Sequence, residues 1–127
     1  MINEKLLNYK DYIVEQGTNG IWEYRKWNSG IAECWFSVSQ LHTFSGSDVK
    51  SWGSVYEGPS TYYTYPSGLF IQEPTNIIQK AGGAGGWLEV GGGASAIRTS
   101  SVYPIYPASK SGTVNCYIGV YAIGRWK

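Results

Sequence analysis

The side chains that could perform acid–base or nucleophilic chemistry are few and scattered in this chain. The only imidazole is that of His42, and neither of its neighbours, Leu41 and Thr43, is an acid, a base or a metal ligand. No serine stands in a Gly-x-Ser-x-Gly elbow, and Cys34 and Cys116 belong to no Cys-x-x-Cys pair or His/Cys cluster. We therefore expect neither a catalytic triad nor a metal site.

The carboxylates likewise indicate no active site. Glycoside hydrolysis uses two carboxylates about 5–10 Å apart, and no spacing in the chain forces such a pair among the available groups, which are Glu23, Glu33, Asp48, Glu57, Glu73 and Glu89. The glycine-rich stretch at 82–93 matches neither a phosphate-binding loop nor a dinucleotide fingerprint, and it is typical of tight turns at the rim of a sheet. The sequence thus predicts a protein that is not an enzyme and uses no cofactor.

Aromatic side chains are the remaining candidates for ligand binding. Trp and Tyr rings stack on the apolar C–H faces of sugars, while their polar groups and nearby Arg, Asn or Asp side chains satisfy sugar hydroxyls. Rings in or beside expected loops, with one arginine, make up the predicted carbohydrate-binding set: Trp52, Tyr62, Tyr63, Tyr65, Trp87, Arg98, Tyr103 and Tyr106. Asp48 is a further polar candidate. The alternative for half or more of these rings is packing in the core or at a subunit interface.

Charge and hydropathy argue against two classes of partner. Lys and Arg number 10 against 9 for Asp and Glu, giving a net charge of +1, which lacks the basic excess that nucleic-acid binding requires. No segment has a signal-peptide pattern or approaches the roughly 20 apolar residues of a membrane span. We therefore expect a soluble, unprocessed chain that neither binds nucleic acid nor inserts into a membrane.

Length and composition indicate one β-domain. The chain has 127 residues, of which 15% are charged and 16% aromatic, with 17 glycines, and this mix is unlike that of helical domains. Asn19-Gly20 predicts a two-residue hairpin turn between strands over 12–15 and 21–27, and residues 28–30 predict a second turn. The other expected elements are a strand over 31–40 with Ala32, Cys34, Phe36 and Val38 on one face, a loop over 43–54, an extended segment over 62–66, and strands beginning at 69 and over 75–80 and 87–90.

The last strand is expected to be apolar on both faces. One face carries Val114, Cys116, Ile118, Val120 and Ala122, and the other carries Tyr117, Tyr121 and Ile123. Because a sheet in a two-layer sandwich should have one polar face in water, this pattern predicts that a symmetric subunit neighbour covers the second face. Cys34 and Cys116 fall on inward faces, where a disulfide is geometrically possible but two buried free thiols are favoured.

The N-terminus could be the end of a stalk. Ile2, Leu6, Tyr9 and Ile13 have the 4-3-4 spacing of a heptad, which favours either a short helical stalk or an arm without regular structure. We therefore divide the chain into an N-terminal segment, residues 1–14, and a β-sandwich head domain, residues 15–127.

Three segments of the chain resemble one family of viral proteins. They are YIVEQG at 12–17, IWEYRKWNSGIAECW at 21–35 and YAIGRWK at 121–127. They resemble the C-terminal head domains of tail-fibre and baseplate receptor-binding proteins from phages and prophages of Gram-positive bacteria, in which W-x-S-G-[IL]-x-E-x-W and AIGRWK are the informative patterns. The resemblance covers both ends of the chain, and the glycine-rich middle matches no pattern.

The resemblance implies a small antiparallel β-sandwich, similar to the H-type lectin fold, that forms a homotrimer at the tip of a fibre. It also implies a place in the virion tail after synthesis in the bacterial cytoplasm, contact with other virion tail proteins, and adhesion to host cell-surface polysaccharide. The motif residues are expected to maintain the fold and the trimer rather than touch a receptor: Trp27, Ser29, Gly30, Glu33, Trp35, Gly124, Arg125 and Trp126. Specificity is expected in the loops over 44–66.

Three functions remain open on the sequence alone. The first is a non-enzymatic receptor-binding head that recognises carbohydrate at or between subunits, where multivalency would strengthen weak individual sites. The second is a purely structural trimeric tip of a phage tail, without glycan binding of its own. The third is a polysaccharide depolymerase that depends on a single Glu or Asp. We expect the first.

Overall fold

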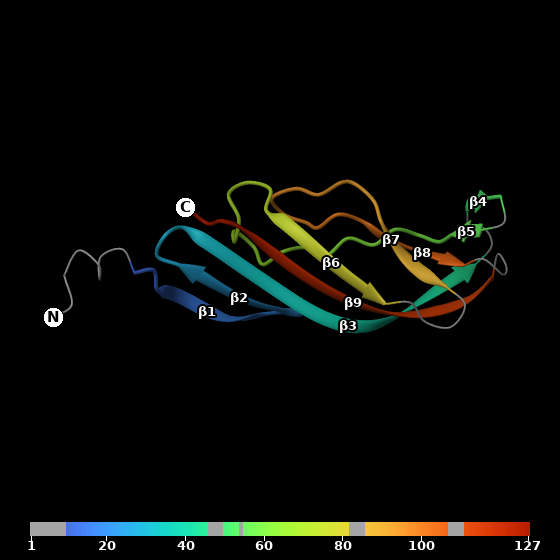
Figure 1. Ribbon diagram of the computed structural model, residues 1–127, viewed down its shortest axis with the longest axis horizontal. Helices are drawn as coiled ribbons and strands as arrows, with labels where there is room; N and C mark the ends of the chain where they lie inside the picture. The colour runs from blue at the N-terminus through green and yellow to red at the C-terminus, as the bar shows by residue number, and fades with distance from the viewer. Residues whose placement is uncertain (1–9, 46–49, 54, 82–85, 107–110) are drawn as a thin grey trace.

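The computed structural model describes residues 10–45, 50–53, 55–81, 86–106 and 111–127 (Figure 1). These residues form nine strands and no helix. All paired strands run antiparallel, and they make two sheets that lie one over the other (Figure 1). The predicted all-β antiparallel sandwich is therefore confirmed.

The two sheets differ in length. The five-stranded sheet has the order β1 (Ile13–Asn19), β2 (Trp22–Trp27), β3 (Ile31–Ser45), β9 (Ser111–Arg125) and β6 (Thr75–Ala81). The four-stranded sheet has the order β4 (Lys50–Trp52), β5 (Val55–Glu57), β8 (Val102–Tyr106) and β7 (Trp87–Val90). In Figure 1, β1 and β2 lie toward one end of the elongated molecule and β4 and β5 at the other.

The first hairpin turns one residue later than the sequence predicts. Asn19 pairs with Trp22, so the two central residues of the turn are Gly20 and Ile21, not Asn19 and Gly20. Gly20 has a φ of 61°, whereas no residue other than glycine has a positive φ among those described. A glycine at the first central position followed by an ordinary residue is the pattern of a type II′ hairpin, and this explains the shift. The second turn, at residues 28–30, lies where it is predicted.

β3 and β9 are the longest strands and pair along their whole length, from Ile31 opposite Arg125 to Ser45 opposite Ser111. The loop predicted over 43–54 is therefore wrong at both of its ends, since β3 continues to Ser45 and β4 occupies 50–52. The Ser- and Gly-rich sequence conceals this extension because the strand is stabilised by its partner rather than by its own propensity.

The core lies between the sheets and is built from alternate residues of the central strands. Its members include Ala32, Cys34 and Phe36 of β3, Cys116, Ile118, Val120 and Ala122 of β9, Trp22 of β2, and Leu88 and Val102 of the second sheet. The predicted inward faces of β3 and β9 are thus confirmed for the described side chains, except that Val38 is 42% exposed. The side chain of Val114, which was also assigned to the inward face of β9, lies outside the described ones.

The strand predicted to begin at residue 69 is absent from this part of the chain. Leu69 and Phe70 are 2% and 6% exposed, and two consecutive buried side chains do not fit the alternation of a half-buried strand. The backbone turns here instead, with the Leu69 amide donating to the Pro66 carbonyl over 3.1 Å. The strands predicted over 75–80 and 87–90 correspond to β6 and β7.

Cys34 and Cys116 are both buried and both free. They lie on neighbouring strands, but Cys34 is opposite Ala122 and Cys116 is opposite Gln40. This offset of six residues corresponds to about 20 Å along the strands, far beyond the reach of a disulfide. Burial raises the pKa of the Cys34 thiol to about 12, so this thiol stays protonated.

The first described residues and the C-terminus lie toward the same end of the sandwich (Figure 1). Asp11 accepts hydrogen bonds from the amide and the hydroxyl of Ser29, at 3.0 and 2.6 Å, and the Trp126 indole donates to the Trp27 carbonyl over 2.8 Å. Asp11 therefore contacts the turn between β2 and β3, and Trp126 contacts the last residue of β2 before that turn. The predicted stalk lies almost wholly in residues 1–9, outside the described residues, and Ile13 and Val14, assigned to the N-terminal segment, belong to β1.

Candidate functional site

One face of the five-stranded sheet carries a group of polar and aromatic side chains that do not belong to the core. We call it the outer face, because its residues alternate with those that point toward the second sheet. The antiparallel register places the following residues on it: Gln16 and Thr18 of β1, Glu23, Arg25 and Trp27 of β2, Glu33, Trp35 and Ser37 of β3, Tyr117, Tyr121 and Ile123 of β9, and Ile77 and Gln79 of β6.

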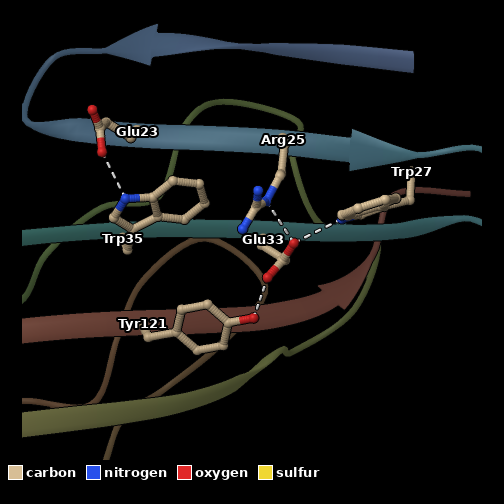
Figure 2. Close-up of polar contacts among 6 residues, drawn as sticks. All are labelled: Glu23, Arg25, Trp27, Glu33, Trp35 and Tyr121. Atoms are coloured by element: carbon tan, nitrogen blue, oxygen red, sulfur yellow. Dashed lines mark hydrogen bonds and ion pairs between the residues drawn. The ribbon is translucent and has the colours of Figure 1, made fainter. Parts of the chain in front are cut away.

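A nearly buried carboxylate lies at the centre of this face. Glu33 is only 8% exposed, and its Oε1 accepts hydrogen bonds from Arg25 Nε at 2.8 Å and from Trp27 Nε1 at 2.7 Å. Its Oε2 accepts a hydrogen bond from the Tyr121 hydroxyl. Figure 2 shows these donors converging on Glu33 from β2 and β9. Three donors compensate the cost of removing this charge from water.

The contacts at Glu33 change the acidity of both partners. Burial alone raises the pKa of the Glu33 carboxyl, but the hydrogen bonds from Tyr121 and Trp27 and the charge of Arg25 outweigh it, so the pKa lies below the ordinary value of 4.5. Burial and the hydrogen bond to Glu33 raise the pKa of Tyr121 to about 12. At neutral pH the carboxyl is therefore ionised and the phenol remains a donor.

Arg25 links two indole rings. Its Cζ atom lies 4.9 Å from the Trp35 ring centroid and 5.6 Å from that of Trp27, within cation–π range of both. Trp35 is held from its other side by Glu23, whose Oε2 accepts a hydrogen bond from Trp35 Nε1 at 2.6 Å (Figure 2). The ring of Trp35 is therefore fixed in place before any ligand arrives, which lowers the entropy cost of binding.

A shallow depression beside Trp35 combines the groups that a sugar requires. It has a volume of about 400 Å³ and is lined by Gln16, Gly17, Thr18, Glu23, Tyr24, Arg25 and Trp35. The Nη groups of Arg25 and the side chains of Gln16 and Thr18 make no hydrogen bond within the described part of the chain. The depression thus offers donors, acceptors and an aromatic ring at one place.

The other half of the outer face, over β9 and β6, is more apolar. A second depression lies between Trp35, Ile77, Tyr117 and Tyr121, and Trp35 therefore lines both depressions. Ile77, Tyr117 and Ile123 are 61%, 40% and 36% exposed. The prediction that β9 is apolar on both faces is confirmed, and in the single chain its outer side chains contact solvent.

The structure brings together two separate pairs from the carbohydrate-binding set predicted from sequence, which are Tyr62 with Arg98 and Trp87 with Tyr103. Tyr62 is 41% exposed, and Arg98 stacks on its ring with Cζ 4.2 Å from the centroid. Trp87 and Tyr103 share the outward face of the four-stranded sheet, where Glu89 lies opposite Tyr103 and accepts a hydrogen bond from Trp87 Nε1 at 3.0 Å. These two groups lie away from the outer face of the larger sheet.

The other predicted members belong to the core or cannot be placed. Tyr65 is 4% exposed, and Tyr63 and Tyr106 are half-buried against the core cluster. Tyr65 therefore packs in the core, which was the alternative to ligand binding for these rings. The side chain of Trp52 and the whole of Asp48 lie outside the described residues, as does the side chain of His42.

Tyr65 offers a simple test of this packing. Its hydroxyl is buried without a hydrogen-bond partner in the described part of the chain, and an unsatisfied buried polar group costs about 1–3 kcal/mol. Replacing Tyr65 with phenylalanine is therefore expected to leave the free energy of unfolding unchanged or to raise it by about 1 kcal/mol, as measured by urea denaturation. A loss of more than 1 kcal/mol would show that the hydroxyl is hydrogen bonded.

The spacing of residues around the turn at 28–30 could have predicted part of the hydrogen-bond network at Glu33, although composition could not. A turn at 28–30 places Arg25 opposite Glu33 and Glu23 opposite Trp35 in the following hairpin. Treating the carboxylates one by one, and assigning Trp27, Glu33 and Trp35 to the maintenance of the fold, missed this pairing. The contribution of Tyr121 could not be read in this way, because β9 is more than 80 residues away in sequence.

Within the described residues, no group of three or more His, Cys, Asp or Glu side chains could hold a metal ion. None of the described segments is a helix long and apolar enough to cross a membrane. No protein-family model, curated protein or solved structure matches the chain.

Proposed function

We propose that this protein is a non-enzymatic head domain of a phage or prophage tail fibre or baseplate that adheres to host cell-surface carbohydrate. The observation that carries the proposal is the depression at Trp35. An immobilised indole stands there beside a guanidinium, a carboxylate, an amide and a hydroxyl, supplied by Arg25, Glu23, Gln16 and Thr18. Stacking on the indole and hydrogen bonding to sugar hydroxyls use these groups together.

The carboxylates of the outer face favour adhesion over hydrolysis. A glycosidase needs a carboxylic acid whose pKa is raised, so that it is protonated when the substrate binds. Glu33 has the opposite property, because its pKa is lowered and its two oxygens already accept hydrogen bonds from Arg25, Trp27 and Tyr121. Its role is to hold Arg25 and the two aromatic side chains in position.

The proposal includes the homotrimer that the resemblance implies. The apolar half of the outer face, around Ile77, Tyr117 and Ile123, would pack against a neighbouring subunit, and the polar half around Arg25 and Trp35 would remain open beside the interface. Three copies of a shallow site on one particle would bind a polymeric surface glycan with avidity. Because Asp11 and Trp126 both attach near the turn at 28–30, a stalk would join the head at that end.

The second candidate is a structural tip module that has no glycan site of its own. It is favoured by the same exposed apolar side chains of β6 and β9, and by the fact that the indole N–H groups of Trp27 and Trp35 are already hydrogen bonded within the chain. On this alternative, the whole outer face would contact other tail proteins. Other virion tail proteins are partners under either candidate.

The two candidates are separated by binding to an array of cell-wall and capsular polysaccharides. Replacing Trp35 with alanine is expected to weaken binding about tenfold or more, because the stacking surface is lost. Trp87 is the matched control: its indole is 38% exposed and, like that of Trp35, donates its N–H to a glutamate. Trp87→Ala is expected to bind as the unchanged protein does.

Circular dichroism would establish that both variants are folded. Loss of binding in Trp87→Ala with retention in Trp35→Ala would instead place the site at Trp87 on β7, within the set predicted from sequence. If neither the unchanged protein nor its variants bound any polysaccharide of the array, the structural module would be favoured.

A further inference from the structure

A second, separate arrangement of charged and aromatic groups lies on the segments around Tyr62 and Arg98. The guanidinium of Arg98 stacks on the Tyr62 ring at 4.2 Å from its centroid, and its Nε donates a hydrogen bond to the Gly93 carbonyl at 3.0 Å. Both side chains are exposed. Stacking and the hydrogen bond together hold the plane of the guanidinium in one orientation.

The backbone around this pair is shaped to fit it. Gly93 has a φ of 87°, and a Cβ atom at this position would lie 2.9 Å from the Tyr62 hydroxyl oxygen, so only glycine fits here. Isolated β-bridges join Thr61 to Val102 and Thr64 to Arg98, which fixes the two segments on either side of the pair. The Arg98 carbonyl also accepts a hydrogen bond from the Ser95 amide at 3.0 Å.

Unlike Arg25, Arg98 has no anionic partner among the residues that the structure describes. The ion pairs among the described residues are Arg25 with Glu33, Lys26 with Glu15 and Lys80 with Glu89. None includes Arg98, and its Nη groups make no hydrogen bond within the described part of the chain. Among the described residues, the Nη edge of the exposed Arg98 side chain is therefore without a partner, while its Nε donates to the Gly93 carbonyl.

We infer that Arg98 binds the phosphate or carboxylate group of an anionic polysaccharide. Two parallel N–H donors in one plane match the two oxygens of either group, and such bidentate pairs are stronger and more directional than a single ammonium contact. Tyr62 would hold the guanidinium in place by stacking on one face, leaving the donor edge available. The neutral sugar units adjoining the anion would lie against the exposed Tyr62 ring.

This inference goes beyond the proposed function, because it concerns another surface and another chemical group. Trp35 and Arg25 lie on the outer face of the five-stranded sheet. Tyr62 lies in the segment between β5 and β6, and Arg98 lies in the segment between β7 and β8. Binding of an anion at Arg98 can therefore succeed or fail independently of sugar binding at Trp35.

The experiment is an NMR titration of the whole chain at low ionic strength, following the Arg98 side-chain Nε–H and the Tyr62 ring signals. The probes are glycerol 1-phosphate, galacturonate and the neutral methyl galactoside. A saturable shift of both signals with a dissociation constant of roughly millimolar order is expected for at least one anion, and none for the neutral sugar. A response to the phosphate alone or the uronate alone assigns the anion, and a response to both assigns either group.

Three variants distinguish a built site from general attraction to positive charge. Arg98→Lys keeps the charge but lacks the fork and is expected to bind about tenfold more weakly. Tyr62→Leu is expected to weaken binding severalfold, because the guanidinium loses its support. Lys10→Gln removes one exposed positive charge elsewhere and is the matched control, with no change expected.

The inference is overturned if neither anion shifts the Arg98 signal, if Arg98→Lys binds as tightly as the unchanged protein, or if Lys10→Gln weakens binding as much as Arg98→Lys. Trp35→Ala should retain anion binding at Arg98 whatever its effect on polysaccharide adhesion. The failure of one proposal is thereby distinguished from the failure of the other.

Discussion

Replacing Glu33 with alanine is expected to lower the free energy of unfolding by about 3 kcal/mol, and hence the midpoint of thermal unfolding by roughly 10 °C. The variant removes the acceptor of three hydrogen bonds, from Arg25, Trp27 and Tyr121. Arg25 has a side chain 37% exposed and can be solvated after the change, so the cost is smaller than that of leaving a fully buried charge unpaired. Urea denaturation, monitored by tryptophan fluorescence, measures the change in the free energy of unfolding.

The matched control is Glu23→Ala. Glu23 also accepts a hydrogen bond from an indole, that of Trp35 at 2.6 Å, but the contact is exposed and single. Its loss should cost about 1 kcal/mol or less. Equal losses in the two variants would contradict the view that Glu33 organises the outer face.

The Glu33 network also predicts how stability depends on pH. The pKa of the Glu33 carboxyl in the folded protein lies below the ordinary value of 4.5, so the ionised form is favoured by folding. This contribution is complete above the unfolded-state pKa and is lost as the pH falls through the folded-state pKa. The difference in unfolding free energy between the unchanged protein and Glu33→Gln should therefore narrow as the pH falls below 4.5. If the difference in unfolding free energy between the two proteins stayed constant down to pH 2, the lowered pKa of Glu33 would be contradicted.

Replacing Ile77 with lysine is expected to reduce the mass of the particle in solution from that of three chains to that of one. Ile77 lies on β6 beside the outward residues of β9, in the apolar half of the outer face. If a neighbouring subunit covers this half, the lysine ammonium must be removed from water at the interface, which costs several kcal/mol. Light scattering at micromolar protein concentration measures the mass.

The chain supplies a closely matched control for this variant. Ile71 is also 61% exposed, like Ile77, but lies in the turn region that follows Leu69 and Phe70. Ile71→Lys should leave the mass unchanged. A mass of one chain for the unchanged protein would refute the trimer and leave the apolar half of the outer face as an exposed patch, while equal dissociation by both lysines would point to a general effect of charge.

The carbohydrate-binding set predicted from sequence shows what residue types alone do not determine. Loop-like sequence around Tyr62 and Tyr65 suggested exposed rings, but the alternation of an extended segment places Tyr62 outward and Tyr65 in the core. Whether a ring is exposed depends on which side of its segment the second layer covers. Composition carries no information about that side.

The local pattern of the sequence by itself determined the all-β class, the second turn, the strands at 75–80 and 87–90, and the two apolar faces of β9. These features depend on alternation and on turn residues, which act over a few positions. Only the tertiary structure decided that β3 and β9 pair along their full length, that Leu69 and Phe70 enter the core from an irregular segment, and that Tyr121 reaches Glu33. Each of these depends on contacts between residues distant in sequence, whose register is set by the packing of the two sheets.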